Sequence, residues 1–410
     1  MSDRSSVPRL PSRSFILALA SIALIGPLAI HLFLPAIPSI KASLAVSDAL
    51  AQLTFSISLL AMATSTLAYG SLADKHGRRP VLLSGVGLFL IGSAICVAAD
   101  SIEILLVGRL VQAVGAGCGL TLVRTIARDA FGADRLVQAI AYFTMFYTLG
   151  PMLAPAIGGI LIDAFGWRSI FVFALATGGL IAAATFIFIP ETRAKTTGNE
   201  LTVGLLLGYR MLFRDLRFTS FVFQTGFSSA AFMTLAAASS PLMQELLNRP
   251  AAEYGLYFLL VPAGFFLGNL VSGRVGRRMS NEAMVLNGAI LSFSTVAVQS
   301  TLLLNGLTNP LTLFIPGFFI TFAQGIALPY AQSGAMATVP KLAGTAAGIG
   351  VFIQFFVGGA ATQLYGILAD GTPRPMIFIM VVSSVLSLGV GIVPTVLASR
   401  ARRPPESASK

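Results

Sequence analysis

The sequence predicts an all-α integral membrane protein in which twelve transmembrane helices form two pseudo-symmetric six-helix bundles. Three observations lead to this fold class: the composition, the spacing of the charged residues and an internal repeat. Of the 410 residues, 55% are hydrophobic and only 10% are charged, and the mean hydropathy is +0.84. A soluble domain carries about a quarter charged residues, so this chain has too few charges to cover a water-facing surface.

Long uncharged stretches alternate with short charged segments. A helix needs about 20 residues to cross the hydrocarbon core of a bilayer, and nine uncharged stretches reach that length. A tenth, residues 104–123, contains only Arg109. The 58 uncharged residues from 283 to 340 must reverse once, at the Asn-Gly and Asn-Pro pairs of residues 305–310, which gives twelve spans. The stretches lack strict alternation, which indicates helices and not barrel strands.

An internal repeat divides the spans into two halves of six. The motif Gly77-Arg78-Arg79 returns 199 residues later as Gly276-Arg277-Arg278. A second set of glycines returns after 200 residues, with Gly150, Gly158 and Gly159 matched by Gly350, Gly358 and Gly359. Duplicated halves are common in secondary transporters, whose binding site lies between the repeats. The expected organisation is a tail, an N-terminal bundle, a linker, a C-terminal bundle and a tail at residues 1–13, 14–190, 191–217, 218–398 and 399–410.

The positive charges predict the orientation in the membrane. Of the 27 Lys and Arg residues, 22 lie in segments on the same side as the N-terminus, four lie on the other side, and Arg109 lies within a span. Cytoplasmic segments carry the excess of Lys and Arg, so both termini are expected in the cytoplasm. The net charge of +11 is thereby explained without a nucleic-acid partner.

Several function classes are excluded by what the sequence lacks. Two cysteines are too few for a disulfide framework. The chain contains no GxxxxGK[ST] motif, and this argues against an ATP-powered pump. No polar stretch is long enough for a catalytic domain, so we expect neither an enzyme nor a bound cofactor or metal.

The loop between spans 2 and 3 reads GSLADKHGRR and resembles the signature of the major facilitator superfamily. The matching residues are Gly70, Leu72, Ala73, Asp74, Gly77, Arg78 and Arg79. The resemblance covers nearly the whole chain and implies the two-bundle fold of that superfamily. It also implies that Asp74 and Arg78 belong to a charge relay that gates the cytoplasmic side, and that Gly77 and Arg79 belong to the same gate. Asp129, at the inner end of span 4, is the expected partner of Arg78.

Spans 4 and 5 carry two further resemblances. Arg109 and Gln112 are similar to the RxxQGxG pattern of proton-coupled exporters, although Ala113 replaces its first glycine. Span 5 resembles the antiporter signature of the superfamily through Gly150, Pro151, Pro155, Gly158 and Gly159. Such glycines also serve ordinary helix packing, but the prolines are missing from the repeated half, which favours a specialised element.

Span 1 indicates one branch within the superfamily. The segment PLAIHLFLPAIP, from Pro27 to Pro38, resembles the bicyclomycin-resistance-like (Bcr/CflA) branch of drug:proton antiporters. That family usually has an aspartate where this chain has His31, so the proton-coupling residue is in question.

His31 and Arg109 are the only ionisable side chains expected well inside the hydrocarbon. Such charges are costly and are normally functional. One interpretation is that His31 carries protons or contacts substrate and that Arg109 tunes this protonation or holds a polar ligand group. The alternative is structural: a neutral imidazole with one hydrogen bond, and an arginine that caps backbone carbonyls.

Other residues are weaker candidates for substrate contact. They are polar or aromatic side chains within the spans: Phe33, Phe55, Gln112, Gln224, Phe227 and Gln324. Each has the alternative role of packing or bonding neighbouring helices.

The sequence therefore predicts a secondary transporter in the cytoplasmic (inner) membrane, multi-pass and monomeric, that exports small amphipathic molecules in exchange for protons. Its partners are the small-molecule substrate, protons and membrane lipid. The absence of a carboxylate in the membrane centre favours neutral, zwitterionic or anionic substrates. The alternatives are a metabolite or organic-anion carrier without proton coupling and a membrane sensor or scaffold that transports nothing.

Overall fold

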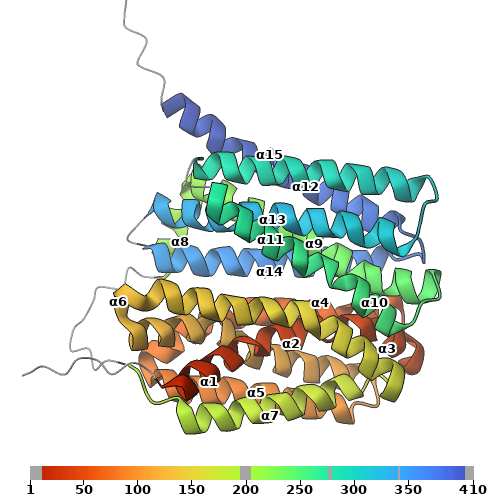
Figure 1. Cartoon of the computed structure of the whole chain (residues 1–410), viewed down its shortest axis with the longest axis horizontal. Helices are drawn as coiled ribbons and strands as arrows, with labels where there is room; N and C mark the ends of the chain where they lie inside the picture. Colours follow the sequence, from red (N-terminus) through yellow and green to blue (C-terminus); the bar gives the residue numbers. More distant parts are fainter. Residues whose placement is uncertain (1–11, 194–204, 276–278, 340–341, 402–410) are drawn as a thin grey trace, which may run out of the picture.

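The computed structural model describes residues 12–193, 205–275, 279–339 and 342–401. Across these ranges the regular structure is entirely helical, and the helices form two bundles that lie side by side. In Figure 1 the N-terminal helices, red to yellow-green, occupy one half of the molecule and the C-terminal helices, green to blue, the other. The predicted fold class is confirmed.

The N-terminal bundle contains seven α-helices and one short 3-10 helix. They are α1 (Arg13–Ala23), α2 (Ile25–His31), η1 (Leu34–Ala36), α3 (Ile37–Leu44), α4 (Asp48–His76), α5 (Arg78–Ala98), α6 (Ile102–Phe165) and α7 (Ser169–Phe188).

The short helix α8 (Leu205–Arg214) precedes the C-terminal bundle. That bundle contains α9 (Leu216–Pro241), η2 (Leu242–Leu246), α10 (Ala251–Phe258), α11 (Leu260–Val275), α12 (Asn281–Leu304), α13 (Pro310–Thr338), α14 (Ala343–Leu368) and α15 (Arg374–Ala401).

Eleven helices of the described chain are long and apolar enough to cross a membrane, and the segment Leu149–Phe165 is a shorter apolar helix. Predicted spans 4 and 5 both lie in α6. The Arg168 guanidinium, just after α6, donates to the Ala99 carbonyl, just before it, at 2.7 Å. Both ends of α6 therefore lie at the same end of the bundle, and the element must reverse between them.

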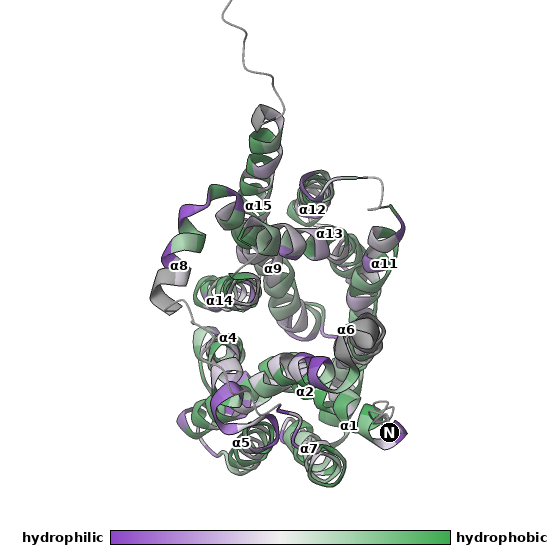
Figure 2. Ribbon diagram, turned by 90° about the vertical axis from the view of Figure 1, so that its left-hand side faces the viewer, coloured by the Kyte–Doolittle hydropathy of each residue, from purple (hydrophilic) through white to green (hydrophobic). Residues whose placement is uncertain are grey.

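The two ends of the molecule are named by residues. The Gly77 end contains Gly77 and α8, and the Lys41 end contains Lys41 and Glu245. Figure 1 shows α8 at one extreme of the long axis and α3 and α10 toward the other, and Figure 2 views the molecule from the Gly77 end.

The first span is not one continuous helix but the series α1, α2, η1 and α3. Pro27, Pro35 and Pro38 explain the breaks, because each proline lacks a backbone donor and its ring clashes with the preceding turn. The broken segment is nevertheless buried, with Leu34, Pro35 and Ala36 all shielded from solvent. The carbonyls left unpaired at the breaks therefore need donors from neighbouring helices.

Glycines allow α5 and α6 to approach closely. A Cβ atom at Gly115 would collide with the backbone of Phe89 and Gly85, and one at Gly85 would meet the Cys118 side chain. Small residues at such contacts are how helices pack in a membrane, where the hydrophobic effect between them is weak.

Some of the predicted domain boundaries differ from the helix bounds of the structure, and others fall on residues that the structure does not describe. The predicted linker 191–217 contains α8, and α15 continues to Ala401, three residues beyond the predicted end of the C-terminal bundle. The repeated motif at 276–278 lies outside the described residues, as do residues 1–11 and 402–410 of the predicted tails 1–13 and 399–410.

We predict that Gly115→Ala lowers the stability of the protein by about 1–3 kcal/mol, the usual cost of overpacking a well-filled core. Thermal unfolding in detergent measures this. Gly179→Ala on α7 is the matched control, because a Cβ there meets nothing within 4 Å and alanine favours helix. Equal melting temperatures for the two variants would contradict the close α5–α6 contact.

Candidate functional site

Arg109 lies in the interior of the N-terminal bundle and is 1% exposed. Its Nε donates to the Thr54 carbonyl on α4 at 3.1 Å, and its Nη1 donates to the Ala29 carbonyl on α2 at 2.8 Å. The last carbonyls of a helix have no partner within it, and Ala29 belongs to the last turn of α2. The guanidinium thus caps the broken first span and fastens it to α4 and α6.

Aromatic rings and an amide complete the environment of Arg109. The guanidinium carbon lies 4.0 Å from the centroid of the Phe33 ring and 5.9 Å from that of Phe171 on α7. Nη1 also donates to Gln112 Oε1 at 2.7 Å, and Gln112 Nε2 donates to Ser93 Oγ on α5 at 2.9 Å. One arginine therefore connects five helices, an arrangement that matches the carbonyl-capping interpretation.

The structure brings together three of the predicted site residues, Arg109, Gln112 and Phe33, inside one bundle. All three are buried, and so is Phe55 on α4. Each described contact of Arg109 and Gln112 stays within the N-terminal bundle. In this conformation these residues are enclosed and do not bridge the two bundles.

His31 is the last residue of α2 and is half-buried. Its Nδ1 atom is shielded from solvent and has no hydrogen-bond partner among the described residues. No described hydrogen bond joins it to Arg109, the other predicted coupling residue. A shielded ring nitrogen without a partner remains free to accept or donate.

The candidates of the C-terminal bundle bond to their own bundle. Gln324 Nε2 on α13 donates to Ser229 Oγ on α9 at 2.9 Å, and Gln224 Nε2 on α9 donates to Ser387 Oγ on α15 at 3.4 Å. The Phe227 ring lies 6.0 Å from that of Phe223. These glutamines join helices here, and their contact with substrate stays a prediction.

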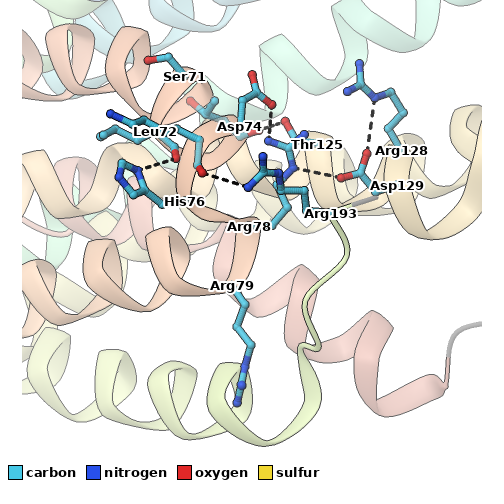
Figure 3. A network of polar contacts seen from close by, with 12 residues as sticks. Ser71, Leu72, Asp74, His76, Arg78, Arg79, Thr125, Arg128, Asp129 and Arg193 are labelled. Atoms are coloured by element: carbon cyan, nitrogen blue, oxygen red, sulfur yellow. Dashed lines mark hydrogen bonds and ion pairs between the residues drawn. The ribbon is translucent and has the colours of Figure 1, made fainter. Parts of the chain in front are cut away.

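The charged residues of the loop signature form a network at the Gly77 end (Figure 3). Arg78 Nη1 lies 2.5 Å from Asp74 Oδ1, and Arg78 Nε lies 3.1 Å from Asp129 Oδ2 on α6. Arg78 is buried, whereas the Asp74 side chain is 69% exposed. The structure therefore places the three residues of the expected relay in contact, with Arg78 between two carboxylates.

Glu191 is a member of this network that the sequence interpretation missed. Its carboxylate accepts the backbone N–H groups of Arg78 at 2.9 Å and Arg79 at 3.2 Å, and so caps the start of α5. Burial acts to raise the pKa of Glu191, but these bonds and those from Arg193 and Thr192 outweigh it, and the pKa is lowered. The sequence signal was an acidic residue directly after span 6.

Gly77 permits this cap. Its φ angle is +100°, which disfavours any other residue, and a Cβ there would contact the Glu191 carboxylate. Arg79 points away from Arg78 (Figure 3): its Nη2 donates to the Phe186 carbonyl on α7 at 2.8 Å. The turn thus ties α4, α5, α6 and α7 together at this end.

The glycines of span 5 lie at two helix contacts. A Cβ at Gly158 would meet the Leu32 carbonyl and Pro35 of the broken first span, and one at Gly159 would meet the Ala251 carbonyl of α10. Gly255 on α10 packs reciprocally against the Pro155 carbonyl of α6. Gly150 abuts Pro27, and Pro151 and Pro155 lie within α6. This segment therefore forms part of the seam between the bundles.

Polar contacts join the two bundles at the Lys41 end. Lys41 Nζ on α3 lies 2.7 Å from Asp48 on α4 and 2.9 Å from Glu245 of the C-terminal bundle. The Asp163 carboxylate, near the end of α6, accepts the N–H groups of Ala251 at 3.2 Å and Ala252 at 2.8 Å. A carboxylate is favoured at this position by the positive end of the helix dipole.

Two amides complete the seam. Gln244 Nε2 donates to the Pro35 carbonyl at 3.0 Å, and Gln363 on α14 accepts from Ser56 Oγ at 2.6 Å and donates to the Ala49 carbonyl at 3.2 Å. Within the described ranges, the hydrogen bonds and ion pairs between the bundles gather toward the Lys41 end. The molecule is therefore closed at that end. Lys41, Asp163 and Glu245 were not among the predicted site residues, because no local motif marks them.

Two helical bundles that meet along glycine-lined helices, with a charged network at one end, are typical of secondary transporters built from duplicated halves. A family model for the Major Facilitator Superfamily matches residues 19–362. The chain belongs to this superfamily.

The relatives and solved structures agree with this assignment. The Multidrug resistance protein D of Escherichia coli (strain K12) is 31% identical over 87% of this chain and 88% of its own length. A Bicyclomycin resistance protein homolog from Haemophilus influenzae is 26% identical over 91% of this chain and 94% of its own. The fold is similar to that of a D-xylose–proton symporter, with a TM-score of 0.77 at 12% identity over 97% of this chain and 99% of that one.

We predict that Arg109→Lys lowers the melting temperature, because an ammonium cannot span the carbonyls of Ala29 and Thr54 as the planar fork does. Each lost bond to a charged donor is worth about 1.5–3 kcal/mol. Arg124→Lys, an exposed position on the same helix, is the control and should unfold like the unaltered protein. If Arg109→Lys is equally stable, the capping role is wrong.

We predict that Glu191→Gln increases amide exchange in the first turn of α5. Because the pKa of Glu191 is lowered from its ordinary value of 4.5, the carboxylate's contribution is complete above pH 4.5 and is lost as the pH falls through the lowered pKa. The difference from the unaltered protein, measured by hydrogen exchange, should be constant from pH 8 to pH 5 and disappear only below that range. A difference that already fades between pH 8 and pH 6 would argue against the cap.

Proposed function

We propose that this transporter exports small amphipathic compounds in exchange for protons, through alternating exposure of a site between the bundles. The observation that carries the proposal is the likeness, over nearly nine-tenths of the chain, to a protein named for multidrug resistance. Relatives named for bicyclomycin resistance and multidrug resistance point the same way. Span 1, with its resemblance to drug:proton antiporters, is intact apart from His31.

Alternating exposure requires the closed Lys41 end to open. The ion pairs of Lys41 are partly exposed, and such pairs contribute about 0–1 kcal/mol each. The other polar contacts of the seam are those of two amides and the Asp163 carboxylate, beside the close glycine contacts. These contacts are individually weak, so the seam can separate without breaking either bundle.

The N-terminal bundle is built to move as one body. Arg109 fastens the broken first span to α4, α6 and α7, and the Gly77 network joins α4 to α7 at one end. Rigid-body motion of one bundle against the other then exposes the site first at one end and then at the other.

His31 is the proposed proton carrier. Imidazole is the only side chain whose unperturbed pKa lies between pH 5 and 8, and the Nδ1 atom of His31 has no competing partner among the described residues. It also lies at the break of the first span, one residue before Leu32, whose carbonyl faces Gly158. Protonation there would act directly on the contact between the first span and the antiporter segment of α6.

The remaining features of the proposal follow from the sequence. The excess of Lys and Arg supports cytoplasmic termini in an inner membrane, and no motif indicates a cofactor. We expect a monomer surrounded by lipid. The lack of a membrane-centre carboxylate favours neutral, zwitterionic or anionic substrates over permanent cations.

We predict that Lys41→Met and Asp163→Asn each shift the protein toward a state open at the Lys41 end. Spin labels at the exposed residues Ser43 and Arg249 report the separation of the bundles, and the two native cysteines are buried and will not react. The distance distribution should move to longer values. Arg374→Gln, at an exposed cation of the same end, should leave it unchanged, and an unchanged distribution in all three variants would contradict the seam.

We predict that His31→Gln abolishes the dependence of substrate flux on an imposed pH gradient in proteoliposomes while ligand binding persists. Glutamine keeps hydrogen bonding but cannot carry the proton. The chain offers a matched control, because its only other histidine, His76, lies exposed at the Gly77 end, and His76→Gln should stay coupled.

The other outcomes choose between functions. If His31→Gln remains driven by the gradient, the proton uses another group, and if the unaltered protein ignores the gradient, it is an uncoupled metabolite or organic-anion carrier. Absence of any flux across a broad ligand set would favour the sensor or scaffold.

A further inference from the structure

The helix α8 is the one amphipathic element of the described chain that the transport mechanism does not use. It has ten residues, lies outside the membrane spans and is located at the Gly77 end. Figure 2 shows it on the outer edge of the C-terminal bundle beside α14. Only Asp215 separates it from α9, which enters the bundle, so α8 lies within one turn of the boundary of the membrane.

One side of α8 packs on the C-terminal bundle. Leu212 is fully buried in a cluster with Phe218, Phe221 and Leu342, and Gly208 faces the same Leu342, which a Cβ there would touch at an ordinary 3.7 Å. These contacts fix the rotation of the helix, and with it the side that faces outward.

The outward side combines large apolar and basic side chains. Met211 is 48% exposed, and Phe213, on the other flank of the helix, is 43% exposed although its ring also packs edge-on against the buried Phe218 at 5.9 Å. Neither belongs to a spanning segment. Arg210 and Arg214, one helical turn apart, are also exposed. The exposed surface of Met211 and Phe213, near the start of span α9, favours an apolar partner. The adjacent guanidinium groups of Arg210 and Arg214 favour a negatively charged one.

The acidic residues close by are already engaged. The Asp215 carboxylate accepts the N–H groups of Arg217 at 2.8 Å and Phe218 at 2.9 Å, as the cap of α9. Glu282 pairs with Arg217. Arg210 and Arg214 have no ion pair with any residue in the described part of the chain, and both are exposed.

We propose that the outward side of α8 binds anionic phospholipid. Arg210 and Arg214 contact the headgroup phosphate, and Met211 and Phe213 enter the region between headgroups and acyl chains. A basic amphipathic helix at a membrane boundary binds through the sum of these two terms. A soluble acidic protein would satisfy the charges but would leave the apolar side chains without the hydrocarbon that lies next to them.

The test uses the purified full-length protein in neutral detergent, titrated with phosphatidylglycerol or phosphatidylcholine, with bound lipid counted by native mass spectrometry. Each basic residue near an anionic surface contributes about 1 kcal/mol, or about fivefold in affinity. The double variant Arg210→Gln/Arg214→Gln should therefore bind phosphatidylglycerol about 25-fold more weakly, with binding of phosphatidylcholine unchanged. Arg374→Gln, at the opposite end, is the control and should bind like the unaltered protein.

Further variants separate charge and apolar contact from folding. Arg210→Lys/Arg214→Lys keeps both charges and should retain most of the affinity, whereas a loss as large as that of the glutamine variant would overturn the proposal. Met211→Ser/Phe213→Ser should weaken both lipids. Glycerol 3-phosphate distinguishes a lipid from a free phosphate: effective competition at concentrations similar to those of the lipid would indicate a soluble anion and would also overturn it.

Discussion

The rest of the structure depends on one constraint, that no backbone carbonyl inside the bilayer can be left without a donor. Continuous helices satisfy it alone, but the first span contains three prolines and breaks into four pieces. Arg109 resolves the conflict by donating to Ala29 on the broken span and to Thr54 on α4. A charge that would be costly in lipid is shielded by the Phe33 ring and by the carbonyls it serves. The break in the first span is thus tolerated because the arginine is there.

The two ends of the molecule are held together differently. At the Gly77 end, the polar contacts of Arg78, Asp129 and Glu191 stay within the N-terminal bundle and make it rigid. At the Lys41 end, Asp163, Glu245 and Gln363 connect one bundle to the other. Strong contacts within a bundle and weak contacts between bundles are what a transporter with moving halves requires. Gly159 on α6 and Gly255 on α10 let the backbones of the two bundles approach closely at this seam.

The sequence alone predicted the membrane spans, the two halves and one contact of the charged network. The spans followed from the spacing of charges, and the halves followed from the repeat. The contact of Arg78 with Asp129 was expected from the resemblance of the loop signature. Glu191 was missed because its role requires that the end of α7 meet the start of α5, which are more than a hundred residues apart. Lys41 and Glu245 are separated by 204 positions, and no local pattern connects them.

By itself the sequence determined that this chain lives in a membrane, where its helices cross, how its halves repeat and to which superfamily it belongs. These properties depend on composition and on spacing along the chain. Only the tertiary structure decided which way each helix is rotated: Arg109 points into its own bundle toward carbonyls, and Gln224 and Gln324 bond to serines of neighbouring helices. Helices apolar on all sides carry no stripe that specifies their rotation. Their orientation is set by close contacts of glycines and by scarce polar partners, which exist only once distant segments are packed together.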